Sequence, residues 1–428
     1  MRNQRFLTGV RKLAVYLRIS LHIPLHYLSP PRYFGTPAAY FRFLFRALRL
    51  LLIFRHNKVV RVFNGYKLHL YLPSYPSRAF FYALESKLLR RSPGPTTVVF
   101  SMTKACQYHC THCYQRNDKG TDLAESLMLD TAREIVERGV AMFDIEGGEP
   151  FVRFNRLSDL LQDLDDRTEI WINTTGAGAS REKVEKLKVA GLFGLMVSIH
   201  SPDAEIHDQM TGVPGSFQTA CDILQICRDL ELTAAINTVL SEAEVKAGGI
   251  DRIMDLSRQL DCDYVQLIHP KPAGEWLGRK EEMQTSSQLL AQVRREHLRY
   301  NSSSRKTYPS LAAQVFEESE SILGCTAGGV DRFYVGASGE VQPCEFLNIS
   351  FGNIKDEPFA HIFARMRSYF PCPCTGWLCC TQAEEIYRIF RDREINDTPL
   401  PWSATRELVD HWGRGRPTPI YRRLGIYK

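Results

Sequence analysis

The chain has 428 residues, of which 44% are hydrophobic and 24% charged, as in an ordinary soluble, folded protein. This length exceeds one typical domain and suffices to bury at least one large core. The longest apolar runs near the N-terminus, Leu13 to Leu17 and Leu50 to Phe54, fall far short of the roughly 20 residues that a bilayer core requires. Basic residues also flank the first run, so we expect neither a membrane-spanning helix nor a cleavable signal peptide.

The net charge of +6 is unevenly distributed along the chain. Fourteen of the 54 basic residues precede the first acidic residue, Glu85, and the 40 that follow are outnumbered by the 48 acidic residues. The chain therefore combines a strongly basic N-terminal region, residues 1–94, with a mildly acidic body. This asymmetry favours a polyanionic partner, either a membrane surface or a nucleic acid.

Two amphipathic helices are predicted in the basic region. The first has apolar residues at helical spacing, at Phe6, Val10, Leu13, Leu17 and Leu21. The second runs from Tyr40 to about Phe54 and carries arginines at helical spacing. Basic amphipathic helices of this kind lie in membrane interfaces. The alternative is that they pack on the rest of the chain and leave their arginines in solvent.

The basic region continues with a predicted hairpin and a helix. Asn64-Gly65 separates two short β-type runs, Val59–Val62 and Tyr66–Tyr71, which is a strong hairpin signal. A helix from about Ser77 to Arg90 follows.

From residue 96 onward, strand-like and helix-like patterns alternate. The predicted strands are Thr97–Ser101, Val140–Ile145, Glu169–Asn173, Gly194–Ile199, Thr233–Thr238 and Tyr264–Ile268. The predicted helices lie at about 127–138, 155–165, 181–190, 216–230, 249–260 and 286–299. Six strand–helix units in sequence indicate an α/β fold, a partial (β/α)6 TIM-like barrel over residues 95–305. Catalytic groups are then expected at the C-terminal ends of the strands.

The C-terminal third has a different composition. Ser302-Ser303-Ser304 marks a polar linker, and residues 320–382 are rich in Gly, Pro and Cys. We interpret this segment as a small domain that is stabilised by a bound metal centre. Residues 383–428 are expected to form one helix, at about 383–394, and an irregular basic end.

Cysteine spacing gives the most specific signal. Three of the twelve cysteines form the string Cys106-x3-Cys110-x2-Cys113, soon after the first predicted strand. Three thiolates on one short loop can ligate three irons of a [4Fe–4S] cluster and leave the fourth open to a small ligand. The alternative is structural zinc, with His109 or His112 as fourth ligand. Clustered cysteines in a chain of this size indicate metal rather than disulfides, and hence a reducing, cytoplasmic compartment.

A second motif follows the second predicted strand: Gly147-Gly148-Glu149-Pro150. Two glycines allow a close approach of backbone to a ligand, and the neighbouring carboxylate can receive an amino group. Alone the string is weak, but its place one strand after the cysteine loop makes it specific.

Together, the two motifs closely resemble the radical S-adenosylmethionine superfamily, in which an aromatic residue, here His112, precedes the last cysteine. The resemblance implies that the cluster binds S-adenosylmethionine and that Gly147, Gly148 and Glu149 hold its amino group, next to Pro150. It further implies reductive cleavage to a 5′-deoxyadenosyl radical that abstracts hydrogen from substrate, with a low-potential electron donor such as flavodoxin or ferredoxin. Later strand ends also fit the family, less specifically: Asn173 and Thr175, then Ser198 and His200 as ribose contacts, and Asn237. Glu146 departs from the family, which often has a small or hydroxyl residue there.

A second resemblance begins at Cys325. The spacing Cys325-x13-Gly339-x4-Cys344, within a predicted hairpin, is similar to the opening of a SPASM or twitch auxiliary-cluster domain. The later cysteines, Cys372, Cys374, Cys379 and Cys380, lack the spacing of a complete SPASM domain. The resemblance therefore implies one second [4Fe–4S] cluster, held by Cys325, Cys344 and two of those four; we name Cys374 and Cys379. A four-thiolate zinc site is the alternative.

Four substrate classes stay open at this point. Relatives with such domains modify peptides, protein side chains or tetrapyrroles, and the basic helices add a lipid or other hydrophobic small molecule. We rank peptide or protein and lipid-like substrates equally, with peripheral contact of residues 1–56 at the inner membrane face. RNA modification is disfavoured because the region is apolar and poor in Lys. A non-catalytic iron–sulfur or zinc protein is disfavoured because it would have no use for the glycine–glutamate motif.

Overall fold

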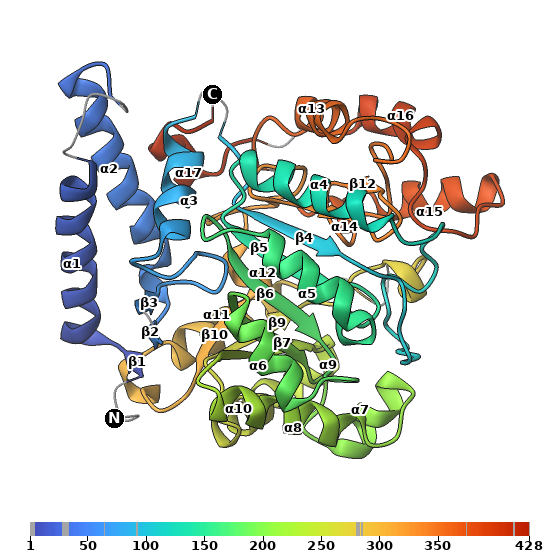
Figure 1. The fold of residues 1–428 in the computed structure, drawn as a ribbon, viewed down its shortest axis with the longest axis horizontal. Helices are drawn as coiled ribbons and strands as arrows, with labels where there is room; N and C mark the ends of the chain where they lie inside the picture. The colour runs from blue at the N-terminus through green and yellow to red at the C-terminus, as the bar shows by residue number, and fades with distance from the viewer. Residues whose placement is uncertain are drawn as a thin grey trace.

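The computed structural model describes residues 5–27, 34–63, 65–90, 93–279, 283, 286–373, 375–413 and 416–427. Its centre is a nine-stranded sheet in the order β10-β9-β8-β7-β6-β5-β4-β11-β12, parallel except for β12 (Figure 1). The strands are β4 (Thr97–Ser101), β5 (Met142–Glu146), β6 (Glu169–Thr174), β7 (Leu192–Ser198), β8 (Thr233–Val239), β9 (Tyr264–Ile268), β10 (Ser310–Ala313), β11 (Arg332–Val335) and β12 (Val341–Gln342). The six predicted strands and the partial TIM-like barrel are thus confirmed.

Two features of the sheet were not predicted. β10 follows the serine linker and pairs with β9 in parallel. The hairpin β11–β12, expected inside a separate C-terminal domain, instead joins the barrel sheet, because β11 pairs in parallel with β4. The cysteine-rich region is therefore continuous with the barrel wall.

Helices cover the outer face of the sheet. Those of the barrel are α4 (Glu125–Glu137), α5 (Phe154–Asp163), α6 (Arg181–Val189), α7 (Ala204–Thr211), α8 (Ser216–Asp229), α9 (Glu242–Lys246), α10 (Gly249–Gln259), α11 (Ser287–Tyr300) and α12 (Gln314–Glu317). The C-terminal part contains α13 (Phe359–Tyr369), α14 (Leu378–Thr381), α15 (Ala383–Asp392), α16 (Trp402–His411) and α17 (Pro419–Leu424). The predicted helices are all present. The expectation of an irregular end after residue 394 is wrong, because α16 and α17 lie there and bury Val409 and Tyr421.

The side chains that point into the barrel change from apolar to polar along the strands. Toward the N-terminal ends the inward residues are apolar: Met142, Trp171, Met196, Ala235, Tyr264 and Ala312 form one cluster. One step further along, the inward positions carry Asp144, Asn173, Ser198, Asn237 and Gln266, because successive residues of a strand alternate between its faces. The polar half of the lumen lies at the C-terminal ends, where catalysis is expected.

The N-terminal region closes the apolar end of the barrel. Its strands β1 (Phe6–Leu7), β2 (Val59–Val62) and β3 (Gly65–Lys67) form a small antiparallel sheet, which places Val60 and Val62 in the same apolar cluster. Lys67 is fully buried there and pairs with Glu169. The predicted hairpin is confirmed, although Asn64 lies outside the described residues and the second strand ends at Lys67.

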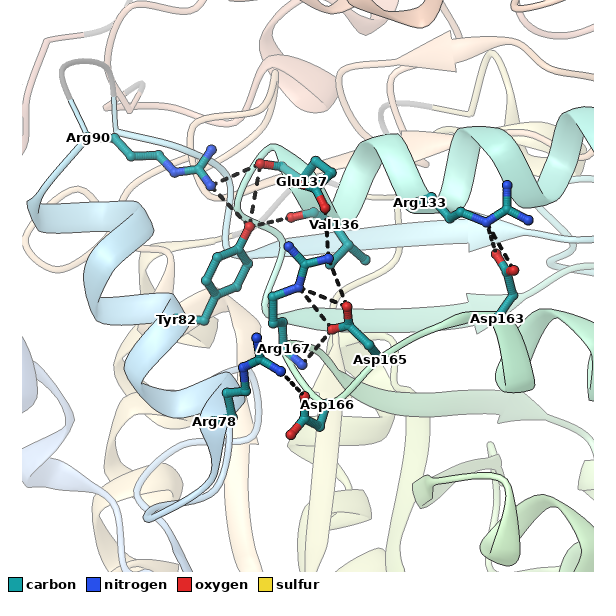
Figure 2. A network of polar contacts seen from close by, with 10 residues as sticks. All are labelled: Arg78, Tyr82, Arg90, Arg133, Val136, Glu137, Asp163, Asp165, Asp166 and Arg167. Carbon is teal, nitrogen blue, oxygen red and sulfur yellow. Dashed lines mark hydrogen bonds and ion pairs between the residues drawn. The ribbon is translucent and has the colours of Figure 1, made fainter.

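A surface network fastens α3 (Arg78–Leu88) to the barrel (Figure 2). Tyr82 donates to the carbonyl of Val136 at 2.6 Å, and Arg78 pairs with Asp166 at 2.6 Å. Because these contacts tie the N-terminal region to loops at the base of the barrel, that region is a packed part of the molecule and not a free arm.

Helices α1 (Gly9–Tyr27) and α2 (Pro37–Ile53) lie at the edge of the molecule, with α1 outermost (Figure 1). The predicted start at Phe6 is wrong, since Phe6 belongs to β1 and pairs with β2. A different apolar set of α1, including Val15, Ile19 and Ile23, is buried. The predicted stripe from Val10 to Leu21 is exposed to solvent, 56–84% at its four leucine and valine positions. Both long faces of α1 are therefore apolar. No helix among the described residues is long and apolar enough to span a bilayer.

Candidate functional site

A cavity of about 300 Å³ opens at the C-terminal ends of the strands. Its wall brings together most residues predicted as cofactor ligands: Cys106, Cys110, His112, Cys113, Gly147, Gly148, Asn173, Thr175, Ser198, His200 and Asn237. Glu149 and Pro150 do not line it. Residues from four strand ends and one loop thus converge on one space, as the parallel barrel requires.

The three cysteines follow β4 and belong to one loop. Burial raises the pKa of Cys110 to about 12, and its neighbours Cys113 and Cys106 add to the shift. Within the described part of the chain, no three His, Cys, Asp or Glu side chains surround a single metal-ion position. A cubane cluster requires no such convergence, since each thiolate binds a different iron. The donor set therefore fits a [4Fe–4S] cluster.

The two histidines offered as a fourth zinc ligand have other contacts. His109 Nδ1 lies 3.1 Å from Arg116 Nη1, and His112 Nε2 lies 3.0 Å from His200 Nε2. These contacts count against the zinc alternative at this loop.

A hydrogen-bond chain assigns the protons of that histidine pair. The backbone N–H of Val239 donates to His200 Nδ1, at 3.3 Å, so His200 carries its own proton on Nε2 and donates it to His112 Nε2. Burial lowers the pKa of His112 to about 4, so its ring is neutral near pH 7. The proton of His112 is thereby left on Nδ1, which is buried without a partner beside Cys113. His200 thus fixes the tautomer of His112 and leaves a buried donor at Nδ1; the contact of His112 with a cofactor stays a prediction.

The two glycines are required by the cysteine loop itself. A Cβ atom on Gly147 would lie 2.5 Å from the carbonyl oxygen of Thr103, and one on Gly148 would lie 2.4 Å from that of Ala105. The backbone of Gly148 and Glu149 donates to the same two carbonyls, at 2.7 and 2.8 Å. The glycines therefore let the second motif pack directly against the segment that leads into Cys106.

Glu149 differs from its expected role. Its fully buried carboxylate accepts four hydrogen bonds: from the hydroxyls of Thr174 and Thr175 at 2.7 Å, and from the backbone of Thr175 and Phe151 at 2.8 and 3.2 Å. Burial raises the pKa of Glu149, and these hydrogen bonds only partly offset that shift. The carboxylate is saturated by the chain, so Glu149 positions the end of β6 at the cavity wall.

Deeper in the cavity are Asp144, which the sequence motifs did not indicate, and Glu146, the residue that departs from the family pattern. Asp144 is 1% exposed and lines the cavity two residues before Glu146 on β5. Glu146 accepts hydrogen bonds from Tyr114, from Gln115 at 2.9 Å and from Asn173 at 3.3 Å. Burial raises the pKa of Glu146 to about 8. The available signal was alternation along β5, which turns residues 142, 144 and 146 to the lumen.

Three of the auxiliary cysteines also gather. Cys325, Cys344 and Cys379 line a small second cavity of about 10 Å³. Cys374 lies outside the described residues. Cys380 lines a different hollow, with Met283 and Trp377, and Cys372 is buried near Arg367. The arrangement fits a thiolate-bound centre at Cys325, Cys344 and Cys379; the full ligand set stays a prediction.

Comparisons with known proteins agree with this geometry. The family model of the radical SAM superfamily matches residues 100–244, and that of the SPASM iron–sulfur cluster-binding domain matches residues 325–374. Fold, cysteine loop and both matches define a radical enzyme that uses S-adenosylmethionine. Residues 100–244 are thus a radical S-adenosylmethionine domain, and residues 325–374 are a SPASM-type domain. Its cofactors are S-adenosylmethionine, a [4Fe–4S] cluster and iron–sulfur in the C-terminal domain.

The similar proteins act on different substrates. An AdoMet-dependent heme synthase from Methanosarcina barkeri is 25% identical, over 64% of this chain and 84% of its own length. The PqqA peptide cyclase of Rhodopseudomonas palustris is 23% identical, over 66% and 77%. The crystal structure of Streptococcus suis SuiB bound to S-adenosylmethionine aligns with a TM-score of 0.53 at 17% identity, over 67% of this chain and 73% of that one. This last likeness concerns the fold.

Proposed function

We propose that the enzyme abstracts a hydrogen atom from a substrate held between the Cys106–Cys113 loop and the auxiliary cysteines. When bound, the cluster and S-adenosylmethionine supply reductive cleavage to a 5′-deoxyadenosyl radical, which can attack an unactivated carbon. The observation that carries the proposal is the convergence of Cys106, Cys110 and Cys113 on one cavity with Gly147 and Gly148.

We assign the following roles to the chain's own residues. The three thiolates hold the cluster, and the backbone at Gly147 and Gly148 forms the wall on which the methionyl part rests. Ser198, His200 and Asn237 line the opposite wall and are suited to the ribose hydroxyls. Cys106 is exposed, so an external low-potential donor such as ferredoxin or flavodoxin can approach the cluster there.

Replacing Cys110 with Ala tests the proposal. The variant should lose nearly all 5′-deoxyadenosine formation in an anaerobic assay with dithionite, and should bind less iron. The matched control is Cys221→Ala, since Cys221 lies on α8 and lines none of the cavities described above. Undiminished 5′-deoxyadenosine from Cys110→Ala would refute the assignment.

For the substrate we propose a peptide or protein, or a hydrophobic small molecule or lipid. The named activities of the similar proteins include peptide cyclisation, which supports the first class. The second class is supported by the outer surface of α1 and α2, which we call the apolar outer face. It consists of Val10, Leu13, Leu17, Leu21, Leu25, Phe41, Phe45, Leu48 and Leu52, all 40–84% exposed.

The apolar outer face also supports peripheral binding to an anionic membrane. Exposed arginines accompany it, namely Arg11, Arg18, Arg42 and Arg49, and residues 5–27 and 34–53 contain no acidic residue. Apolar side chains flanked by arginine are the features of helices that lie in the headgroup region. A solvent-exposed helix without such a role would place polar residues on its outer side.

Co-sedimentation with vesicles of phosphatidylcholine and phosphatidylglycerol tests membrane binding. The wild-type protein should bind in a salt-sensitive manner, and the double variant Leu17→Glu/Leu21→Glu should bind at least about tenfold less. The control is Val189→Glu, which changes an even more exposed apolar residue on α6. Equal binding of the double variant and the control would remove the membrane proposal without affecting the radical chemistry.

A further inference from the structure

The inner end of the active cavity adjoins the auxiliary cysteines. Gln314, Arg332 and Phe346 line both this cavity and the small one with Cys325, Cys344 and Cys379. We call the part bounded by Asp144, Glu146, Gln314 and Glu345 the inner chamber. Because its lining adjoins the auxiliary cysteines and belongs to the cavity that also contains Cys106, Cys110 and Cys113, a substrate placed there would lie between the two cysteine sites.

The inner chamber presents hydrogen-bond acceptors that the chain does not satisfy. Oδ1 of Asp144 is buried without a partner. Two amides have the same feature: Asn173 donates its NH2 to Glu146 at 3.3 Å and Gln314 donates to Glu318 at 3.3 Å, so the carbonyl oxygen of each is left without a partner. Because Gln314 is only 8% exposed and uncharged, it is evidence independent of the acidic residues. Buried unpaired acceptors indicate a ligand that brings donors.

The charges point to a cation. Burial raises the pKa of Asp144 well above its ordinary value, and Glu146 and Glu345 raise it further, while a hydrogen bond with Asn173 and the charge of Arg332 oppose them more weakly. Arg332 is already engaged, since its Nη1 binds Glu318 at 2.9 Å, although its Nε is without a partner. The other two cations of the cavity lie at the cysteine loop: Lys104 donates to the carbonyl of Gly120 at 2.8 Å, and Arg116 lies 3.7 Å from Glu275. No available cation among the described residues therefore compensates Asp144 and Glu146, so burial favours their protonated forms, and a bound cation would stabilise their charged forms.

We propose that the inner chamber binds a cationic group of the substrate, an ammonium or guanidinium, through Asp144 and the carbonyl of Gln314, with Glu146 beside them. Such a group brings both the missing donors and the missing charge. The inference deepens the proposed function and rests on it: it selects an amine- or guanidine-bearing substrate, such as a peptide with Lys or Arg or an amino lipid. A substrate whose polar groups are all carboxylates would bring further acceptors and none of the missing donors.

The ammonium of S-adenosylmethionine is the other source of such a cation, and the test must separate the two. Agmatine, which carries an ammonium and a guanidinium, is titrated calorimetrically into the reconstituted holoenzyme saturated with S-adenosylmethionine. Glutarate serves as an anion of similar length. Agmatine should bind and glutarate should not, and Asp144→Asn and Glu146→Gln should each weaken agmatine binding by about tenfold or more.

The control is Asp166→Asn, an identical change at an exposed ion pair on the base of the barrel (Figure 2). Agmatine affinity equal in Asp144→Asn, Glu146→Gln and wild type would overturn the proposal. So would tighter binding of glutarate, no binding of agmatine, or agmatine binding only when S-adenosylmethionine is omitted. If Asp144→Asn does not fold, Glu146→Gln alone decides. Formation of 5′-deoxyadenosine by the same wild-type preparation tests the radical function separately, so either conclusion can fail alone.

Discussion

The two ends of the barrel lumen use the same strands for opposite purposes. At the base, the buried charge of Glu169 is fully paired: it binds Lys67, the indole of Trp171 at 2.9 Å and the backbone of Ser74 at 2.7 Å. At the other end of the same sheet, Asp144 is equally buried and has an unpaired oxygen. Since an unpaired buried acceptor costs stability, it persists where a ligand completes it. The two ends of the lumen thus differ in whether the buried carboxyl oxygens have partners: those of Glu169 do at the structural end, and one of Asp144 does not at the binding end.

The largest expected loss of stability comes from removing Glu169, the partner of Lys67 at the base of the lumen. Glu169→Ala leaves the ammonium of Lys67 buried without its counter-charge, which should destabilise the protein by about 3–5 kcal/mol. Thermal unfolding of the anaerobic holoenzyme measures this loss. The double variant Lys67→Met/Glu169→Leu should recover most of it, because both charges are removed. A small effect of Glu169→Ala would mean that the base is not the structural end.

Glu149 is an exception to this contrast, because its carboxylate is fully hydrogen-bonded although it lies at the binding end of the lumen. Glu149→Ala removes the acceptor of four donors, so we expect a loss of about 2–4 kcal/mol in stability and a weaker affinity for S-adenosylmethionine. Equilibrium dialysis at matched iron content measures the affinity, and Glu149→Gln, which keeps an acceptor, should restore part of it. Unchanged affinity in Glu149→Ala would refute the positioning role.

The sequence predicted the binding end better than it predicted contacts between distant segments. The cysteine loop and Gly147-Gly148 were found because their residue types and spacing are local features of the chain. The inner chamber was not, since it combines Asp144 in the middle of the sheet with Gln314 from one edge and Arg332 and Glu345 from the other. No local pattern indicates that β11 pairs with β4.

The N-terminal region shows a second limit. Helical spacing identified α1 and α2, but it selected the exposed stripe of α1 and missed the buried one. A helix that is apolar on two faces gives no periodic signal for which face packs inward. Similarly, β10 was missed because Ser310–Ala313 is short and lacks the β-branched residues that identify a strand.

Gly148 tests how tightly the two motifs of the binding end are joined. In Gly148→Ala the new Cβ would lie 2.4 Å from the carbonyl oxygen of Ala105, so the cysteine loop must shift. We expect roughly half or less of the wild-type iron content, with a stability loss of about 1–3 kcal/mol. Gly413→Ala is the control, because no atom lies within 4 Å of the position where its Cβ would be. Full iron loading of Gly148→Ala would show that the glycines serve another purpose.

The last prediction concerns the pH dependence of stability. Burial raises the pKa of Glu146 to about 8 from the 4.5 expected in the unfolded chain. Between these values the folded state binds a proton that the unfolded state has lost, so Glu146 makes stability fall as pH rises, by at most about 1.4 kcal/mol per pH unit. In Glu146→Gln this contribution disappears, and unfolding measured between pH 5 and pH 8 should depend less on pH. An unchanged pH dependence of unfolding in Glu146→Gln would contradict the assignment of this contribution to Glu146.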